Sequence, residues 1–235
     1  MIIFIERRMT MKQEEKILTE GLVDELELNT LKIITSDILK GYTSIGNYAF
    51  YICNSITSIT IPNSITSIGD RAFYSCSFLT FVNLPNSIIN IGYDTFAYCS
   101  SLTHINIPNS IKRIENYAFY MCDRLTNIII GDKTYETQKV VDSKCKAYKA
   151  FRGDMTCRCF QYEEGKTYEI KNEPKLCKWG FHACLNLKDV FMYYYGELGK
   201  DIVIHEVELE GVSDERNDYD SKVVAKKITI GKRIL

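Results

Sequence analysis

Apolar side chains recur through the middle of the chain in a pattern that repeats every 23 residues. In each unit, one apolar residue is followed three and five positions later by two more, as in Ile56, Ile59 and Ile61. The last two alternate with polar residues, which is typical of a strand with one buried face. A proline such as Pro62 then ends the strand because it has no N–H to donate to a ladder. Four such triplets begin at Ile56, Leu79, Leu102 and Leu125.

The second half of each unit carries an aromatic residue and a cysteine at fixed positions. The phenylalanines are Phe50, Phe73, Phe96 and Phe119, and the cysteines are Cys53, Cys76, Cys99 and Cys122, with Cys145 in the same phase. We expect Asp70 to cap one helical turn that points Phe73 and Cys76 inward. One unit cannot bury its apolar face alone, whereas stacked units share a continuous core. The period therefore predicts phenylalanines lined up one above the next, with the cysteines packed as small buried hydrophobes.

Residues 61 to 76 read Ile-Pro-Asn-Ser-Ile-Thr-Ser-Ile-Gly-Asp-Arg-Ala-Phe-Tyr-Ser-Cys. This segment resembles the BspA-like (Treponema-type) leucine-rich repeats, whose consensus is Ile-Pro-x-Ser-Ile-x-x-Ile-Gly-x-x-Ala-Phe-x-x-Cys. The resemblance covers residues 42 to 131, and residues 31 to 41 look like a degenerate first strand. It implies a curved right-handed solenoid and a role in adhesion or protein binding.

The outward residues of the strands form a candidate partner-binding face. Thr, Ser and Asn side chains there can hydrogen-bond a partner, and Phe81, His104 and Ile129 can act as apolar or aromatic anchors. Phe81 is the strongest single candidate because an outward phenylalanine exposes apolar area without structural gain. Threonine rows also simply favour strands, so a purely structural reading stays open. The candidate residues are Ser58, Thr60, Phe81, Asn83, His104, Asn106, Asn127 and Ile129.

The regions that flank the repeats predict an α+β fold class. A helix over about residues 11–20, ended by Gly21, is expected to cap the solenoid. The predicted domains are a cap with a degenerate first repeat (1–41), the solenoid (42–132), a linker or last irregular repeat (133–145) and an α+β module (146–235). In that module, strands are expected at 146–151, 167–170, 180–184, 202–209 and 221–230. A helix is expected at 186–195, with Asn186 as its N-cap and Gly196 as its stop.

The C-terminal module has its own recognisable segments: Lys146 to Phe151, Cys157 to Lys166, Leu176 to Cys184 and Ser221 to Ile228. They resemble a small uncharacterised domain of phage and bacterial proteins, with Cys159 where that domain has glycine. The resemblance implies a phage or mobile-element origin and no assignable reaction. It suggests the hypothesis that the protein binds and inhibits a host defence complex, such as a nucleoprotein complex, in the host cytoplasm.

Composition and charge indicate which cellular compartment and which classes of partner to expect. The formal net charge is -1, so no overall basic field attracts nucleic acid or a membrane surface. The nine cysteines are an odd number, and the N-terminal apolar run is too short for a secretory signal. No stretch approaches the roughly 20 apolar residues of a membrane span. We therefore expect a cytoplasmic protein with reduced thiols, a protein partner, and no membrane, small-molecule substrate or cofactor.

The C-terminal module has three chemical alternatives: a zinc site, an ADP-ribosyltransferase-like fold and a nucleic-acid interface. Cys157, Cys177, His182 and Cys184 supply zinc-type ligands, but their spacing matches no common zinc module, so no metal is expected. A fold like that of ADP-ribosyltransferases requires a catalytic glutamate on a late strand. Glu206 and Glu208 instead lie on the strand before the last one, which is expected at 221–230. A nucleic-acid interface would use a basic patch interleaved with Tyr148 and Phe151. The basic residues are Lys146, Lys149, Arg152, Lys222, Lys226, Lys227, Lys232 and Arg233.

Overall fold

A computed structural model describes residues 17–136, 144–152, 154–157, 160–171, 174, 181–193, 202–213 and 220–234. The chain divides into two compact units, Met1–Leu125 and Thr126–Leu235. The first is a leucine-rich-repeat solenoid built mostly from short strands, and the second is built around a five-stranded sheet. No helix in the described part of the chain is long and apolar enough to span a membrane.

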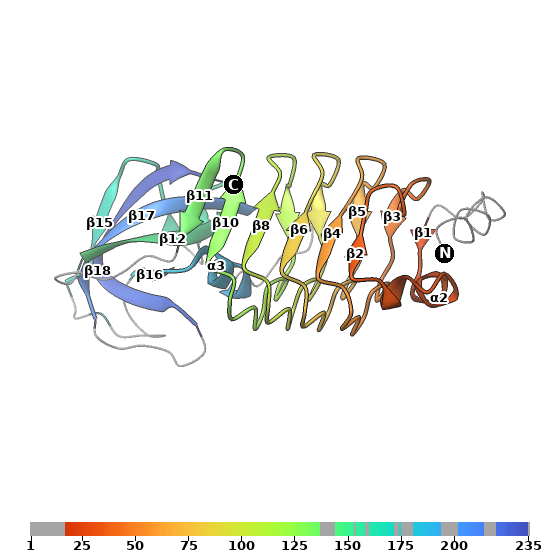
Figure 1. Ribbon diagram of the computed structural model, residues 1–235. Coiled ribbons are helices and arrows are strands. Elements are labelled where there is room, and N and C mark those ends of the chain that lie inside the picture. The colour runs from red at the N-terminus through yellow and green to blue at the C-terminus, as the bar shows by residue number, and fades with distance from the viewer. Residues whose placement is uncertain are drawn as a thin grey trace. The chain divides into compact units, whose positions relative to one another are not determined.

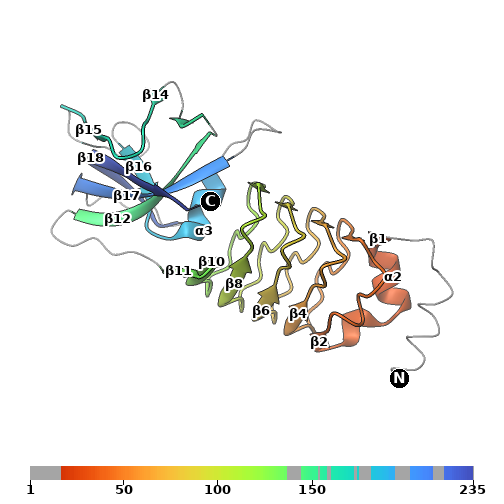
Figure 2. The same ribbon diagram turned by 90° about the horizontal axis from the view of Figure 1, so that it is seen from above.

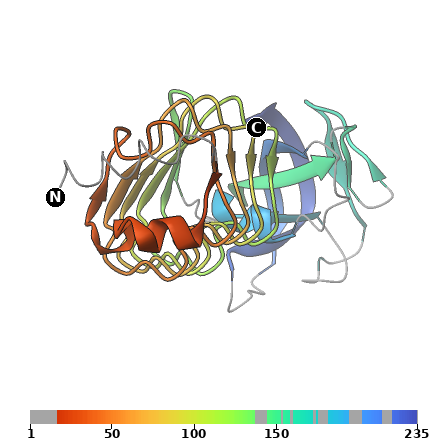
Figure 3. The same cartoon turned by 90° about the vertical axis from the view of Figure 1, so that its right-hand side faces the viewer.

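The solenoid unit stacks its coils through two parallel sheets (Figure 1). One contains β1 (Ile17–Leu18), β3 (Ser44–Ile45), β5 (Ser67–Ile68), β7 (Asn90–Ile91) and β9 (Arg113–Ile114). The other contains β2 (Ile33–Ile34), β4 (Ser58–Thr60), β6 (Phe81–Asn83) and β8 (His104–Ile107). From β4 to β8, each residue pairs with the residue 23 positions further on. In Figure 3 the coils accordingly overlie one another.

The predicted phenylalanine stack is confirmed. Neighbouring ring centroids along Phe50, Phe73, Phe96 and Phe119 lie 5.1, 5.3 and 5.7 Å apart, with ring planes within 6° of parallel. All four side chains are buried, and so are the cysteines that follow them. Parallel rings one coil apart stack in the centre of the unit, as the close packing of protein interiors favours.

The helical turn expected after each glycine is wrong: residues 46–53 and 69–76 form turns instead. Alternate N–H groups donate to the next coil, as Phe50 N does to Ala72 O at 2.7 Å, and those between them donate three residues back, as Tyr51 N does to Tyr48 O at 2.9 Å. No continuous helix can form with this alternation. The Asp70 carboxylate does not cap its own segment but accepts a hydrogen bond from Tyr93 N of the next coil at 2.8 Å. A Cβ at Gly69 would lie 2.3 Å from Asn47 Oδ1, so glycine is required where coils approach this closely.

The N-terminal helix is shifted from its predicted place. Helix α2 (Glu20–Glu25) begins after Thr19, whose hydroxyl accepts a hydrogen bond from Leu22 N at 3.3 Å. Ile17–Leu18 is strand β1, and Gly21 lies inside the helix instead of ending it; residues 11–16 lie outside the described residues. The prediction failed because N-capping and burial of Leu22 and Val23 outweigh the low helix propensity of one glycine. The short 3-10 helix Leu28–Thr30 follows, and then β2, where a degenerate strand was expected.

Residues 133–145 were expected to be a linker or a last irregular repeat, and residues 133–136 form strand β11 (Lys133–Glu136), which pairs antiparallel with β10 (Asn127–Ile130). The two-residue turn has Gly131 at its first position with φ 59°, as hairpin turns of this length favour. The Gly-Asp pair was a readable hairpin signal that the repeat period obscured. Cys145 keeps the phase only in sequence, because it lies in β12 (Lys144–Arg152), which belongs to the C-terminal sheet.

The C-terminal sheet closes on itself through its strand pairings, and Figure 2 shows the strands crossing one another. Strand β12 pairs with β16 (Phe181–Cys184) and β17 (Ile202–Val212), and both of these pair with β18 (Lys222–Arg233). Strand β15 (Thr167–Glu169) extends the sheet beside β18, and β13 (Thr156–Cys157) pairs with β14 (Phe160–Gln161). Helix α3 (Leu187–Tyr193) lies against β12 and β16. The sequence-predicted strands coincide with these elements to within a few residues. The predicted helix agrees with α3 as far as Tyr193, and its expected stop at Gly196 lies outside the described residues.

Candidate functional site

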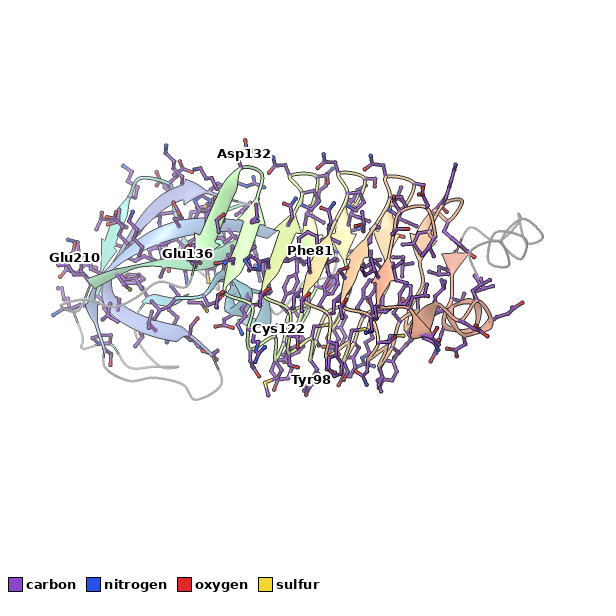
Figure 4. All side chains as sticks on the ribbon, viewed as in Figure 1. Phe81, Tyr98, Cys122, Asp132, Glu136 and Glu210 are labelled. Atoms are coloured by element: carbon purple, nitrogen blue, oxygen red, sulfur yellow. The ribbon has the colours of Figure 1, made fainter. Side chains whose placement is uncertain are left out.

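The predicted partner-binding residues of the solenoid unit share one face of the sheet that contains β2, β4, β6 and β8. Ser58, Phe81 and His104 are register partners on β4, β6 and β8, and Thr60, Asn83 and Asn106 form the next row. We call these six residues the sheet face. Phe81 is 43% exposed in the middle of it, and Figure 4 shows this side chain on the β-strands. None of the six carries a formal charge at neutral pH, so the face offers hydroxyl, amide, imidazole and aromatic groups.

Asn127 and Ile129, the other two candidates, lie on β10 in the second unit. Within their hairpin they pair with Glu136 and Thr134, respectively, and both are partly buried.

The threonine row beside the sheet face has a structural role. The hydroxyl of Thr80 donates to Thr57 O at 2.9 Å, and that of Thr103 donates to Thr80 O at 3.4 Å. Thr57 likewise donates to Lys32 O at 2.9 Å. These hydroxyls bind the carbonyl of the preceding coil, so the row stabilises stacking.

A second exposed surface, absent from the sequence predictions, lies on four turn segments: residues 46–54, 69–77, 92–100 and 115–123. Seven tyrosines and one arginine form two rows there that run from coil to coil. The first row is Tyr51, Tyr74, Tyr98 and Tyr120, whose successive ring centroids lie 5.3, 5.2 and 5.5 Å apart. The second row is Tyr48, Arg71, Tyr93 and Tyr117. We call these eight side chains the tyrosine array.

The arginine occupies the place of a ring within the second row. The Arg71 guanidinium carbon lies 5.8 Å from the Tyr48 ring centroid and 5.5 Å from that of Tyr93. It donates to the Tyr48 hydroxyl at 2.9 Å and to the Asp94 carboxylate at 3.0 Å. Burial raises the pKa of Asp94 from its ordinary value, and the guanidinium opposes that shift. A planar cation between two phenol rings is therefore already part of the array.

The period concealed the array because one coil breaks it. At the positions equivalent to Arg71 and Tyr74, the third coil has Asp94 and Ala97, and both are buried. Tyr93 and Tyr98, each one residue away, fill the rows instead. The signal that could have revealed the array is the concentration of tyrosine in the turn segments, read without a strict phase.

Left-handed backbone also gathers on the turn segments. Two positions in every coil have positive φ without being glycine, with values between 54° and 61°: Tyr48, Ile52, Arg71, Ser75, Asp94, Tyr98, Tyr117 and Met121. Each costs about 1 kcal/mol or more, and such conformations persist only where the surroundings enforce them. Here the hydrogen bonds to neighbouring coils do so, as that of Tyr98 N to Tyr120 O at 2.7 Å illustrates.

The repeat thiols are part of the stacking. Cys76, Cys99 and Cys122 are buried, and each Sγ donates to a phenylalanine carbonyl of the preceding coil at 3.0–3.1 Å. Burial raises the pKa of Cys53 to about 11 and raises the pKa of Cys99 well above its ordinary value. The thiolate is the nucleophile and the metal ligand, so the geometry makes these thiols inert.

The zinc candidates of the C-terminal unit lie only partly within the described residues. His182 and Cys184 are on β16 and Cys157 is on β13, whereas Cys177 lies outside them. Within the described part of the chain, no three His, Cys, Asp or Glu side chains are grouped to hold a metal ion. The absence of a metal stays a prediction.

The aromatic part of the nucleic-acid alternative is wrong. Tyr148 and Phe151 are 2% and 1% exposed, respectively, so neither ring can stack on a base. Lys149 is also buried, and its ammonium donates to His182 O at 2.8 Å. The strand alternation that places Phe151 in the module core also turns Lys149 inward. The ADP-ribosyltransferase alternative stays a prediction.

The sequence profile of the BspA type leucine rich repeat region matches residues 28–149 in six copies. The chain belongs to this family. The six copies exceed the four units predicted from the strict period, and the match extends to either side of them. A second profile, described as a domain of unknown function (DUF7666), matches residues 145–235 of this BspA-type chain. No curated protein matches this chain.

Solved structures similar to this BspA-type chain are also leucine-rich repeat proteins. One from T. pallidum is 24% identical, with a TM-score of 0.35, over 42% of this chain and 58% of its own. One from Bacteroides ovatus is 28% identical, with a TM-score of 0.34, over 43% of this chain and 34% of its own. The chain thus spans about a third to somewhat over half of the length of these relatives.

Proposed function

We propose that the protein is a non-enzymatic protein-binding module and that its sheet face docks the partner. The single observation that carries the proposal is Phe81, 43% exposed in the centre of a regular sheet with Ser58 and His104 in register on either side. Interface cores are depleted in charged residues and enriched in aromatic anchors, which is the composition of this face.

Two exposed phenylalanines provide a matched test. Phe81 lies on the sheet face, whereas Phe78 is 58% exposed but precedes strand β6. In affinity capture from the native host lysate, Phe81→Asp is expected to lose the partners that wild type retains, and Phe78→Asp to keep them. The reason is that a carboxylate buried at an interface centre loses its hydration without a compensating charge. If Phe81→Asp keeps every partner, or both variants lose them equally, the sheet-face proposal is wrong.

A finer proposal concerns the identity of the partner. We propose that the partner is a host protein complex, with a nucleoprotein defence complex as the specific case, and that binding inhibits it in the host cytoplasm. The support is the resemblance of residues 146–230 to a domain of phage and bacterial proteins. The test is phage plating on a host with an active defence system. Wild-type chain is expected to restore plaques and Phe81→Asp is not, and equal plating with an empty vector would contradict this proposal.

The domain roles are proposed on the same basis. We propose that residues 1–41 cap the solenoid, because α2 buries Leu22 and Val23 and β1 and β2 pair with the first coils. We propose residues 133–145 as the last irregular repeat and 146–235 as an α+β module. Deleting residues 1–30 is expected to cause concentration-dependent aggregation, measured by light scattering, because the apolar end of the stack is then uncovered. A deletion variant that stays monomeric contradicts the capping role.

A further inference from the structure

The tyrosine array has the features of a binding surface separate from the sheet face. Tyr48, Tyr51, Tyr93 and Tyr98 are between 36% and 39% exposed, and Ile52 and Met121 beside them are 48% and 42% exposed. Figure 4 places Tyr98 at the border of the coils, away from Phe81 on the sheet. The rings already contact one another along and between the rows, so they lose little side-chain freedom when a partner binds.

The two halves of the array differ in how their rings are oriented. In the N-terminal half, Tyr51 and Tyr74 are stacked at 19°, so each ring face covers the next. In the C-terminal half, the Tyr98–Tyr120 and Tyr93–Tyr117 pairs meet at 88° and 86°. In each perpendicular pair, one ring turns its face across the row instead of along it. One ring of each perpendicular pair therefore has faces that the other ring does not cover, and the negative face of a ring quadrupole attracts cations.

Charge on the turn segments favours the same kind of ligand. The four segments contain the acidic residues Asp70, Asp94, Glu115 and Asp123 and one basic residue, Arg71. Arg71 is paired with Asp94, and Glu115 is paired with Arg113 at 2.7 Å, outside the segments. Asp70 and Asp123 are exposed. Arg113 and the exposed Arg124 lie within two residues of the last segment, so complementary charge is a minor contribution to binding a positively charged partner here.

Arg71 shows which cation fits. Its guanidinium lies between two rings of the second row, hydrogen-bonded to a phenol hydroxyl and to a carboxylate. We propose that the C-terminal half of the tyrosine array binds arginine side chains of a partner protein in the same manner. The guanidinium planes lie against Tyr98, Tyr117 and Tyr120. This site lies on a different surface from the sheet face, so either proposal can fail alone.

The test uses the full chain and two labelled ten-residue probes, one alternating glycine with arginine and one alternating glycine with lysine. Fluorescence anisotropy at physiological salt is expected to show the arginine probe binding about five- to tenfold more tightly, because guanidinium stacks on rings better than ammonium. Tyr98→Ala with Tyr120→Ala is expected to weaken binding of the arginine probe about tenfold. Phe81→Ala is expected to leave it within twofold, since Phe81 lies on the sheet face.

Several results would overturn the proposal. Equal affinity for both probes would indicate charge attraction alone, and no binding of either probe would remove the site. Unchanged binding in the double tyrosine variant, with an unchanged circular dichroism spectrum, would place the arginine elsewhere. If light scattering shows that the wild type is a dimer and the double tyrosine variant is a monomer, the surface binds a second copy of the chain.

Discussion

The two units bring distant residues together in different ways. In the solenoid, the neighbour of a residue in the next coil is the residue 23 positions away, as Phe73 and Phe96 illustrate. In the C-terminal unit, partners are set by antiparallel pairing across long loops, such as Tyr148 with Glu206 and Phe181 with Ala225. A period can be read from a sequence, but a pairing across a loop cannot. The solenoid was therefore predictable residue by residue, and the C-terminal unit only element by element.

The largest expected effect tests whether the solenoid depends on its continuous stack. Phe96→Ala removes a fully buried ring between Phe73 and Phe119 and leaves a cavity. The free energy of unfolding is expected to fall by about 3–5 kcal/mol in urea denaturation. Phe78→Ala, at a mostly exposed ring, is the control and should change it by less than about 0.5 kcal/mol. Similar losses in both variants would contradict a shared interior.

A glycine pair tests close approach between coils. A Cβ at Gly69 lies 2.6 Å from Asn47 N, and at Gly21 nothing lies within 4 Å. Gly69→Ala is expected to destabilise the protein by about 1–3 kcal/mol, because the coils must move apart. Gly21→Ala, inside α2, is expected to stabilise it by about 0.5–1 kcal/mol through helix propensity. Thermal melts followed by circular dichroism measure both, and a neutral Gly69→Ala would show that the coils can separate at little cost.

Cysteine alkylation compares the two units directly. With iodoacetamide at pH 8, Cys145 and Cys157 are expected to react first because both are only partly buried. Cys76, Cys99 and Cys122 should react about a thousandfold more slowly, only through opening of the stack. Since burial raises the pKa of Cys99 well above its ordinary value, raising the pH to 9 should not release its thiolate. Peptide mass spectrometry measures the rates, and fast modification of Cys99 in native protein would contradict tight stacking.

The smallest expected effect separates the threonine row from the sheet face. Thr80→Val keeps the branched shape and removes the hydroxyl that donates to Thr57 O. Because the site is exposed, the change in unfolding free energy is expected to stay within about 0.5 kcal/mol. Partner capture should be unchanged, since this hydroxyl serves stacking. Loss of capture with unchanged stability would move the threonine row into the binding surface.

The predictions that failed concern residues whose spatial neighbours do not follow from the 23-residue period. Asp70 was taken as a local cap, but its carboxylate serves the next coil. Residues 133–145 lack the repeat and were expected to be a linker or a last irregular repeat, and the antiparallel strand Lys133–Glu136 was not predicted. The sheet-face residues were found because strand alternation predicts their direction. Whether they bind a partner is a prediction that the stacked geometry supports but does not test.

The sequence by itself determined the coil: its length, the inward phenylalanine and cysteine, and the outward rows of each strand, because repetition forces equivalent residues into equivalent surroundings. Only the tertiary structure decided that Tyr93 and Tyr98 complete two aromatic rows while Asp94 and Ala97 turn inward. The physical reason is that a side chain one residue out of phase can still reach the same surface. A strict period cannot express that adjustment.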